Sequence, residues 1–255
     1  MLNVVSVSKK IGSIILNDDI NISIPQQSLT CIMGPNGAGK STLMSMMSGE
    51  NSPCEGLITW RGKDIHATSA EELAKDRAVL TQRNQISFGF SVRDVIMMGR
   101  LPWSESKQDT QRILHLVLGD LGLERLADRS IHSLSGGEMQ RVALARALCQ
   151  IQSTDTSYLL LDEPTAALDV SHAHDFLKIV KTRCASGMTG CVILHDFSLA
   201  LRYADFVVLM SKGRIVAEGA PLEVFSTDVM AEVFGVVLYV QKNPHGGYYI
   251  CVEPN

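Results

Sequence analysis

A glycine-rich segment near the N-terminus has the residue types and the spacing of a phosphate-binding loop. It matches the pattern G-x-x-x-x-G-K-[ST] and lies between an apolar run typical of a strand (29–33) and a pattern typical of a helix (41–48). Glycines allow the backbone to wrap closely, so that successive N–H groups and the start of the helix face phosphate oxygens. Lys40 supplies a positive charge for the β- and γ-phosphates of a nucleotide, and the Ser41 hydroxyl is a suitable ligand for Mg²⁺. The residues of this predicted site are Gly34, Pro35, Asn36, Gly37, Ala38, Gly39, Lys40, Ser41 and Thr42.

Two adjacent acidic residues supply the groups that hydrolysis requires. Asp162 and Glu163 directly follow an apolar run typical of a strand, residues 158–161, and open α/β sheets bind ligands at the carboxyl ends of their strands. Asp162 suits the Mg²⁺ shell, usually through water, and Glu163 suits the polarisation of an attacking water. Adjacent carboxylates at a strand end can also be simply solvated, but the phosphate loop upstream favours the catalytic interpretation.

The segment Ser135-Gly136-Gly137-Glu138 allows a structural and a functional interpretation. Ser-x-x-Glu ahead of an amphipathic run is a capping box that begins a helix. A helix N-terminus preceded by glycines is also an anion site, so the two interpretations are compatible. The local pattern does not say whose phosphate this site would hold.

The elements that must position these residues are those of an α/β protein. Short β-branched runs alternate with helical patterns, which predicts a mainly parallel sheet covered by helices. Further strands are expected at 77–81, 191–194 and 206–210, and a hairpin turn leads from the last of these into residues 214–216. Residues 85–150 have a helical pattern and are predicted to form an inserted helical subdomain, and the chain ends with a helix to about 235 and two short strands.

The composition excludes several other classes of protein. The chain has 255 residues, of which 45% are apolar and 20% charged, so it is neither disordered nor fibrous. A net charge of −4 and an aromatic content of only 5% argue against nucleic-acid binding. The six cysteines lie far apart, which indicates free thiols in a reducing compartment. No secretory signal or run of 18 apolar residues is present, so a soluble, cytoplasmic protein is expected.

The motifs, taken in their order along the chain, resemble those of the nucleotide-binding subunits of ATP-binding-cassette (ABC) transporters. They are GPNGAGKS, Gln82, LSGGE, YLLLDE, Ala167-Leu168-Asp169 and His195, and the resemblance covers nearly the whole chain. It implies a P-loop NTPase core with a mainly parallel sheet, an antiparallel β subdomain and an inserted helical subdomain. The single domain, 1–255, would comprise an ATP-binding core (1–84 and 151–235), the helical subdomain (85–150) and a C-terminal β extension (236–255).

The resemblance also implies an assembly. Two copies of the chain would form a homodimer that holds two ATP molecules head to tail. Ser135, Gly136 and Gly137 of one subunit would close on the γ-phosphate that Lys40 of the other subunit holds.

Four more positions acquire implied roles in the same way. Gln82 would reach the metal ion and the nucleophilic water, and His195 would bond the γ-phosphate. Asp169 would contact the partner subunit. The aromatic residue that often stacks on adenine in the family is matched by Ile11, so that aliphatic contact would replace stacking.

The type of transporter is indicated by residues 86–102, which resemble importers of iron chelates, haem and vitamin B12. The polar spacer at 152–157 and the Val233-Phe234-Gly235-Val236 tail are more like the haemin-importing branch. The expected partners are two copies of a transmembrane permease and, indirectly, a periplasmic binding protein, with no direct contact between this chain and the cargo. The subunit would then lie at the cytoplasmic face of the bacterial inner membrane. The apolar residues 86–98 fit a surface that docks on the permease, or alternatively a segment that faces the core.

Other functions are less consistent with the sequence. Import of ferric siderophores or cobalamin is the nearest alternative. A soluble cassette ATPase that acts on ribosomes or DNA usually has two cassettes or a long coiled coil, and this chain has neither. A non-hydrolysing scaffold is disfavoured by the presence of Lys40, Asp162, Glu163 and His195 together. His172 and His174 are not expected to form a metal pair, since residues two apart do not face each other on a helix, and His245 is expected in a turn.

Overall fold

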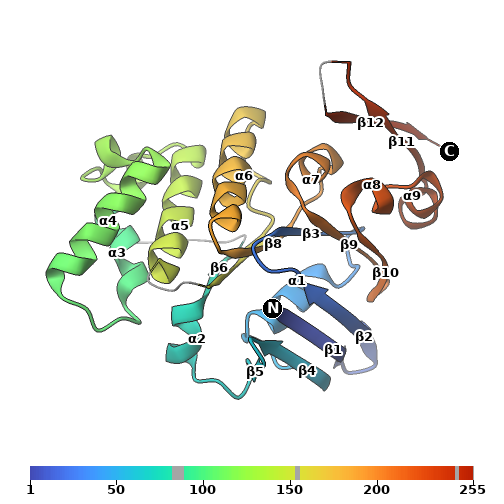
Figure 1. Ribbon diagram of the computed structural model, residues 1–255, viewed down its shortest axis with the longest axis horizontal. Helices are drawn as coiled ribbons and strands as arrows, with labels where there is room; N and C mark the ends of the chain where they lie inside the picture. The colour runs from blue at the N-terminus through green and yellow to red at the C-terminus, as the bar shows by residue number, and fades with distance from the viewer. Residues whose placement is uncertain (82–88, 153–155, 245–246, 255) are drawn as a thin grey trace.

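The computed structural model describes residues 1–81, 89–152, 156–244 and 247–254, and Figure 1 shows how their elements are arranged. A six-stranded sheet forms the centre of the molecule, with the strand order β10-β9-β3-β8-β7-β6. Its strands are β3 (Leu29–Met33), β6 (Arg77–Leu80), β7 (Tyr158–Asp162), β8 (Thr189–Ile193), β9 (Phe206–Ser211) and β10 (Arg214–Gly219). All neighbours pair in parallel except β10, which returns antiparallel to β9 through the predicted hairpin. The α/β prediction with a mainly parallel sheet is confirmed.

The central sheet is covered on both faces, which explains why its strands are continuous apolar runs. Along β7, Leu159 and Leu161 pack into one hydrophobic cluster, whereas Tyr158 and Leu160 pack into the other. Each of these four side chains is at most 1% exposed. Burial on both faces requires no polar residue at alternate positions, so the strand sequence loses the usual two-residue alternation.

One face of the central sheet is covered by helix α1 (Lys40–Met47) and a second sheet, which lies at the bottom of Figure 1. That sheet has the order β2-β1-β4-β5 and is antiparallel. Its strands are β1 (Leu2–Ile11), β2 (Ile14–Ile24), β4 (Glu55–Trp60) and β5 (Lys63–Asp64). Leu43, Met46 and Met47 of α1 are fully buried between the two sheets. The antiparallel subdomain that the family resemblance implies is therefore present.

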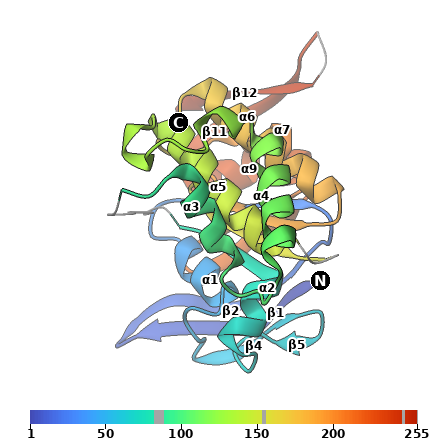
Figure 2. The same ribbon diagram turned by 90° about the vertical axis from the view of Figure 1, so that its left-hand side faces the viewer.

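Helices cover the opposite face, and Figure 2 shows several of them from the side. They are α3 (Val92–Met97), α4 (Lys107–Leu121), α5 (Gly136–Ile151), α6 (Val170–Ala185), α7 (Phe197–Tyr203), α8 (Pro221–Val224) and α9 (Thr227–Phe234). Helix α2 (Ala70–Asp76) packs instead through Leu73 on the same face as α1. The chain ends in a hairpin of β11 (Val236–Lys242) and β12 (Tyr248–Pro254). The described residues between 89 and 151 contain α3, α4 and α5 and no strand, which agrees with the predicted helical pattern.

The apolar segment that precedes α4 faces the core rather than solvent. Val92, Val95 and Ile96 of α3 are fully buried, and Phe90 is 37% exposed. Residues 82–88 lie outside the described part of the chain. The core-facing alternative is therefore correct at Val92, Val95 and Ile96, where the expectation of an exposed apolar docking surface is wrong, whereas Phe90 is exposed.

A buried arginine fixes the turn that follows α3. The Arg100 side chain is only 4% exposed and forms an ion pair with Glu105. It also donates hydrogen bonds to the backbone carbonyl oxygens of Cys149 and Gln150 at the end of α5. Its guanidinium carbon lies 4.7 Å from the centre of the Trp103 ring. These contacts satisfy the buried charge and hold the turn against α5.

We expect Arg100→Ala to destabilise the chain by about 3–5 kcal/mol, because it removes the cation that pairs with the mostly buried Glu105 carboxylate. Urea unfolding of the purified chain measures this change. Arg93→Ala is the matched control, since the Arg93–Asp128 pair is exposed and such pairs contribute at most about 1 kcal/mol. Equal effects of the two substitutions would contradict a structural role for the buried pair.

Candidate functional site

The candidate site lies at the carboxyl ends of three neighbouring strands of the central sheet. Strand β3 leads into the glycine-rich loop, β7 ends at Asp162 and Glu163, and β8 leads to His195. Since β3, β8 and β7 are adjacent and parallel, their carboxyl ends meet at one edge. The structure thus brings together residues that are separated by more than 150 positions in the sequence.

The glycine-rich loop is fixed by close backbone contacts on two sides. Gly34 has φ +148°, and a Cβ atom there would overlap with the carbonyl oxygen of Met210 in β9. Gly39 has φ +94°, and a Cβ atom there would overlap with the carbonyl oxygen of Leu16 in β2. Asn17 Nδ2 also donates a 3.3 Å hydrogen bond to the Gly39 carbonyl oxygen. Any other residue at positions 34 and 39 would displace the loop, so the glycines are required by packing as well as by conformation.

Lys40 is held inside the loop that it follows. The residue is 5% exposed, and its Nζ donates to the carbonyl oxygens of Gly34 (2.8 Å) and Pro35 (2.9 Å). Burial lowers the pKa of Lys40 from its ordinary value, and the nearby carboxylates of Glu163 and Asp162 oppose this shift. The two hydrogen bonds therefore fix the Lys40 ammonium against the backbone of the glycine-rich loop.

Ser41 and Asp162 form a pair of oxygen donors beside the loop. Ser41 Oγ donates a 3.3 Å hydrogen bond to Asp162 Oδ1. Burial raises the pKa of Asp162, the Ser41 hydrogen bond lowers it, and the neighbouring Glu163 charge raises it further. A hydroxyl and a carboxylate are hard oxygen donors of the kind that Mg²⁺ prefers, so this pair fits the metal ion that the sequence predicts.

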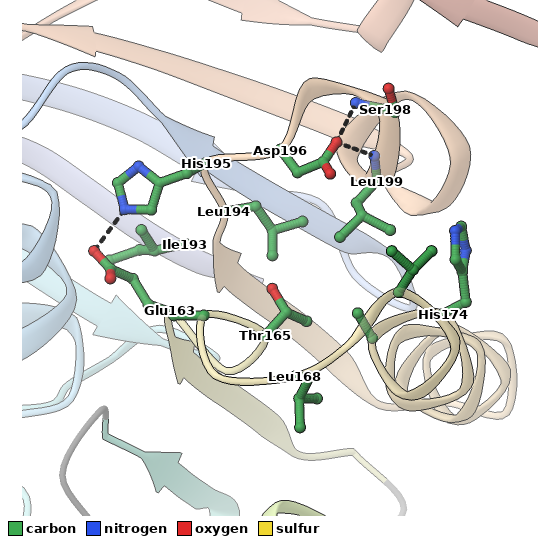
Figure 3. Close-up of a pocket in the computed structure, with 13 residues that line it drawn as sticks. Glu163, Thr165, Leu168, His174, Ile193, Leu194, His195, Asp196, Ser198 and Leu199 are labelled. Atoms are coloured by element: carbon green, nitrogen blue, oxygen red, sulfur yellow. Dashed lines mark hydrogen bonds and ion pairs between the residues drawn. The ribbon is translucent and has the colours of Figure 1, made fainter. Parts of the chain in front are cut away.

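Glu163 and His195 face each other in the pocket of Figure 3. Glu163 Oε1 lies 2.7 Å from His195 Nε2, and the Glu163 side chain is 21% exposed. The Glu163 backbone has φ +48°, an unfavourable conformation for a residue with a side chain, and such strain occurs often at functional sites. The pocket has a volume of about 360 Å³, and a water molecule takes up roughly 30 Å³, so water has room beside this pair.

The Ser135–Glu138 segment forms the predicted capping box at the start of α5. Ser135 N donates to Glu138 Oε2 (2.8 Å), and Glu138 N donates to Ser135 Oγ (3.3 Å). The hydrogen bond from the Ser135 backbone N–H, followed by that from its hydroxyl, lowers the pKa of Glu138. Within the described part of the chain, no hydrogen bond joins this segment to the phosphate loop. It lies instead against α6, where Gly137 contacts His172.

Asp169 begins helix α6 and is held by His172. Asp169 Oδ1 accepts a hydrogen bond from the His172 backbone N–H, and Asp169 Oδ2 lies 2.9 Å from His172 Nδ1. These two bonds, the backbone one first, lower the pKa of Asp169. His174 pairs instead with the Tyr203 hydroxyl at 2.8 Å, so the two histidines have separate partners.

Sequence reasoning missed two polar contacts of this region. The first is the contact of His172 with both Asp169 and Gly137. The second is Gln140 Nε2, which donates a 2.8 Å hydrogen bond to the Pro164 carbonyl oxygen, one residue after Glu163. The short spacing between Asp169 and His172 could have revealed the first bond, because a residue that begins a helix commonly bonds the third residue after it.

Three other residues were singled out in the sequence. Gln82 and His245 are outside the described residues. Ile11 is at the tip of the β1–β2 hairpin and is 64% exposed, and Ile14, its cross-strand partner, is equally exposed. The hairpin thus presents aliphatic side chains on the same strand pair that packs against Gly39 through Leu16.

Comparison with known proteins assigns this architecture to a family. Residues 17–166 match the family model described as "ABC transporter". The "Hemin import ATP-binding protein HmuV" of Aliivibrio fischeri is 39% identical over 239 residues, which cover 94% of this chain and 92% of that protein. The protein of the same name from Pseudomonas entomophila is 39% identical over 253 residues and 99% of both chains. The dimeric ATP-binding cassette MJ0796 bound to ADP and Pi has a TM-score of 0.74 and 26% identity, over 87% of this chain and 99% of that one.

The chain therefore belongs to the ABC transporter family, and it is an ABC ATPase. Each helix in the described ranges is too short or too polar to cross a membrane.

We expect Asp162→Asn to raise the melting temperature of the chain by about 2 °C at pH 8. Because burial raises the pKa of Asp162, ionisation of this carboxyl is less favourable in the folded than in the unfolded chain, and it lowers stability above the raised pKa. Asparagine removes the charge but keeps an oxygen for the Ser41 hydrogen bond. The difference should shrink as the pH falls through the raised pKa, since the wild-type carboxyl then binds a proton.

Thermal unfolding between pH 8 and pH 4, without nucleotide or divalent metal, measures this effect. Asp175→Asn, at an exposed position on α6, is the matched control and should not change the pH dependence. An Asp162→Asn variant that melts below the wild type at pH 8 would show that the ionised carboxylate stabilises the fold.

Proposed function

We propose that this chain is the ATP-hydrolysing subunit that energises haemin import through a membrane permease. The hydrolytic part rests on one observation, the meeting of Lys40, the Ser41–Asp162 pair and the Glu163–His195 pair at a single sheet edge. The cargo rests on the relatives named for hemin import, which are 39% identical over nearly the whole chain. The resemblance of residues 86–102 to importers of iron chelates, haem and vitamin B12 agrees with this assignment.

Different residues of the site would bind the ATP phosphates and the Mg²⁺ ion. The backbone N–H groups of residues 34–39, the start of α1 and the Lys40 ammonium would bind the β- and γ-phosphates of ATP. Ser41 and Asp162 would hold Mg²⁺, with Gln82 as a further ligand. A bound Mg²⁺ ion neutralises phosphate charge as it develops.

Glu163 would orient and polarise the attacking water, while His195 would bond the γ-phosphate. The 2.7 Å contact between Glu163 Oε1 and His195 Nε2 supports this proposal, because it would keep the base beside the residue that bonds the phosphate. An attacking water that lies within hydrogen-bond reach of Glu163 can give up its proton as the bond to phosphorus forms.

The complete site would require two subunits. Ser135, Gly136 and Gly137 form an anion-binding helix start that their own phosphate loop does not use. In a homodimer they would contact the γ-phosphate that the partner holds, and Asp169 would contact the partner chain. Two permease subunits, with a periplasmic binding protein beyond them, would complete the importer at the inner membrane. The ATP-binding core (1–84 and 151–235), the helical subdomain (85–150) and the C-terminal β extension (236–255) would be the parts of each ATPase subunit.

Glu163→Gln should slow ATP hydrolysis by about 10²–10⁴-fold, because it removes the base but keeps the size of the side chain. ATP binding should survive, since the phosphate contacts come from residues 34–41. The variant should therefore accumulate as an ATP-stabilised dimer, which sizing with and without ATP detects. Glu232→Gln on α9, at an exposed site, is the isosteric control and should hydrolyse ATP normally. Near-normal hydrolysis by Glu163→Gln would transfer the catalytic role to another residue, with His195 the next candidate.

The cargo is tested by reconstituting the chain with its permease and binding protein in vesicles. ATP should drive uptake of haemin at least about 10-fold faster than uptake of ferric siderophores or cobalamin, measured side by side. The complex with Glu163→Gln is the control for uptake that does not require hydrolysis. Preferential uptake of a siderophore or of cobalamin would show that haemin is not the cargo, and the ATPase assignment would still hold.

A further inference from the structure

The contact between Gly137 and His172 joins two segments that the sequence analysis treats separately. One is the start of α5, residues 135–137, and the other is the Asp169 turn at the start of α6. A Cβ atom added at Gly137 would lie 3.0 Å from His172 Cγ and 3.2 Å from both Cδ2 and Nδ1. Three atoms of the imidazole ring therefore pack against the Gly137 backbone and occupy the space of a side chain.

The neighbouring glycine shows that this contact is specific. A Cβ atom at Gly136 would meet nothing within 4 Å. Glycine near the start of a helix costs about 1 kcal/mol relative to alanine, so an unexplained glycine there calls for a reason. At position 137 the His172 ring supplies that reason within the subunit, whereas at position 136 the described structure supplies none.

The same imidazole holds the Asp169 carboxylate. Because hydrogen bonds from His172 lower the pKa of Asp169, the carboxylate is ionised and accepts, and His172 Nδ1 is the donor. The His172 backbone N–H occupies the other carboxylate oxygen at 2.9 Å. His172 thus contacts both oxygens of a side chain that is 65% exposed, and the Ser171 backbone contributes a further, weaker interaction.

A second bond connects the same two parts of the chain. Gln140, one turn along α5, donates through Nε2 to the Pro164 carbonyl oxygen at 2.8 Å. The start of α5 is therefore tied at two points to the segment 164–172, which begins directly after Glu163. Fixing two surface turns in advance lowers the entropy lost when both are ordered against a partner.

We propose that His172 is a positioning residue that holds the Ser135–Gly137 turn and the Asp169 carboxylate in one arrangement, ready to bind the second subunit. This inference rests on the proposed two-subunit ATP site. His172 would act through its contacts with Gly137 and Asp169. Without His172, the Ser135–Gly137 turn and the Asp169 carboxylate are less well ordered for contact with the second subunit and its ATP. ATP binding at Lys40 of the same subunit is unaffected.

The test measures ATP-dependent dimerisation in the Glu163→Gln background, so that hydrolysis does not deplete the dimer. At saturating ATP, the double variant Glu163→Gln/His172→Ala should need about 10-fold more protein to reach half-dimerisation. Binding of a fluorescent ATP analogue to the dilute chain should be unchanged. Glu163→Gln/His174→Ala is the matched control on the same helix and should dimerise like the parent.

The outcomes separate the two proposals. If Glu163→Gln itself does not dimerise with ATP, the two-subunit site is wrong. If the parent dimerises and the His172→Ala variant dimerises equally well, or loses ATP binding in parallel, the positioning role is wrong. His172→Asn retains a donor for Asp169 but lacks the ring. The protein concentration at which it is half dimerised should lie between those of the alanine variant and the parent. It also replaces the alanine variant if that variant folds poorly.

A double-mutant cycle tests the ring contact directly. Gly137→Ala should weaken dimerisation by displacing the ring, and adding His172→Ala should cause little further loss, because the methyl group then occupies the vacated space. Gly136→Ala and His172→Ala should instead have additive effects. If the losses of dimerisation caused by Gly137→Ala and His172→Ala were also additive, the proposed role of the Gly137–His172 contact would be wrong.

Discussion

The phosphate loop is packed between two sheets, and the rest of the site depends on that packing. Gly34 lies against the Met210 carbonyl of the central sheet, and Gly39 lies against the Leu16 carbonyl of the antiparallel sheet. The loop can therefore adopt its conformation only when both sheets are formed and correctly spaced. The antiparallel sheet is thus part of the nucleotide site, although its strands supply no residue to hydrolysis.

The site holds charges in an environment that disfavours them. Burial shifts the pKa of Lys40 downward and that of Asp162 upward, each toward the neutral form, and the two opposite charges only partly offset the cost of burial. The positive φ of Glu163 adds backbone strain at the next residue. Phosphate charge beside Lys40, and a cation beside Asp162, would relieve these unfavourable terms. Lys40, Asp162 and Glu163 therefore lower the stability of the empty fold but would strengthen the binding of phosphate and a cation. A trade of stability for function is usual at such sites.

Much of this arrangement could be predicted because it is local in the sequence. The central strands are continuous apolar runs, and the phosphate loop, the Asp162-Glu163 pair and the capping box are short patterns with a direct physical meaning. The observed strands of the central sheet differ from the predicted ones by at most three residues at their ends. The antiparallel sheet was accessible only through the family resemblance, since register shifts within β1 and its exposed Val5 break the two-residue alternation.

Contacts between distant segments could not be predicted in this way. From its residue type, Arg100 would be expected on the surface. In the structure it donates hydrogen bonds to two backbone carbonyl oxygens of α5, from residues about 50 positions away in the sequence. The His172 ring against Gly137 likewise depends on how α5 and α6 pack, and no pattern within either segment reports it. Burial of Val95 and Ile96 was equally undetermined, because an apolar helix face is identical in sequence whether it meets the core or a partner.

In the proposed two-subunit arrangement, each chain would hold two incomplete halves of different sites, and the position of the α5 helix start is consistent with this. The phosphate loop, Asp162 and Glu163 converge at the sheet edge, whereas the anion-binding turn at Ser135 is tied through α6 to Asp169. A turn that is fixed to its own subunit in this way cannot also fold over its own phosphate loop without breaking those contacts. Under the two-subunit proposal, its ligand would be a phosphate that another copy presents. The solved cassette bound to ADP and Pi is dimeric, which is compatible with this arrangement. Hydrolysis would then require assembly. Because Gln140 links α5 to the residue after Glu163, a shift of the α5 start over one nucleotide would act on the Glu163 segment, which would serve the other nucleotide.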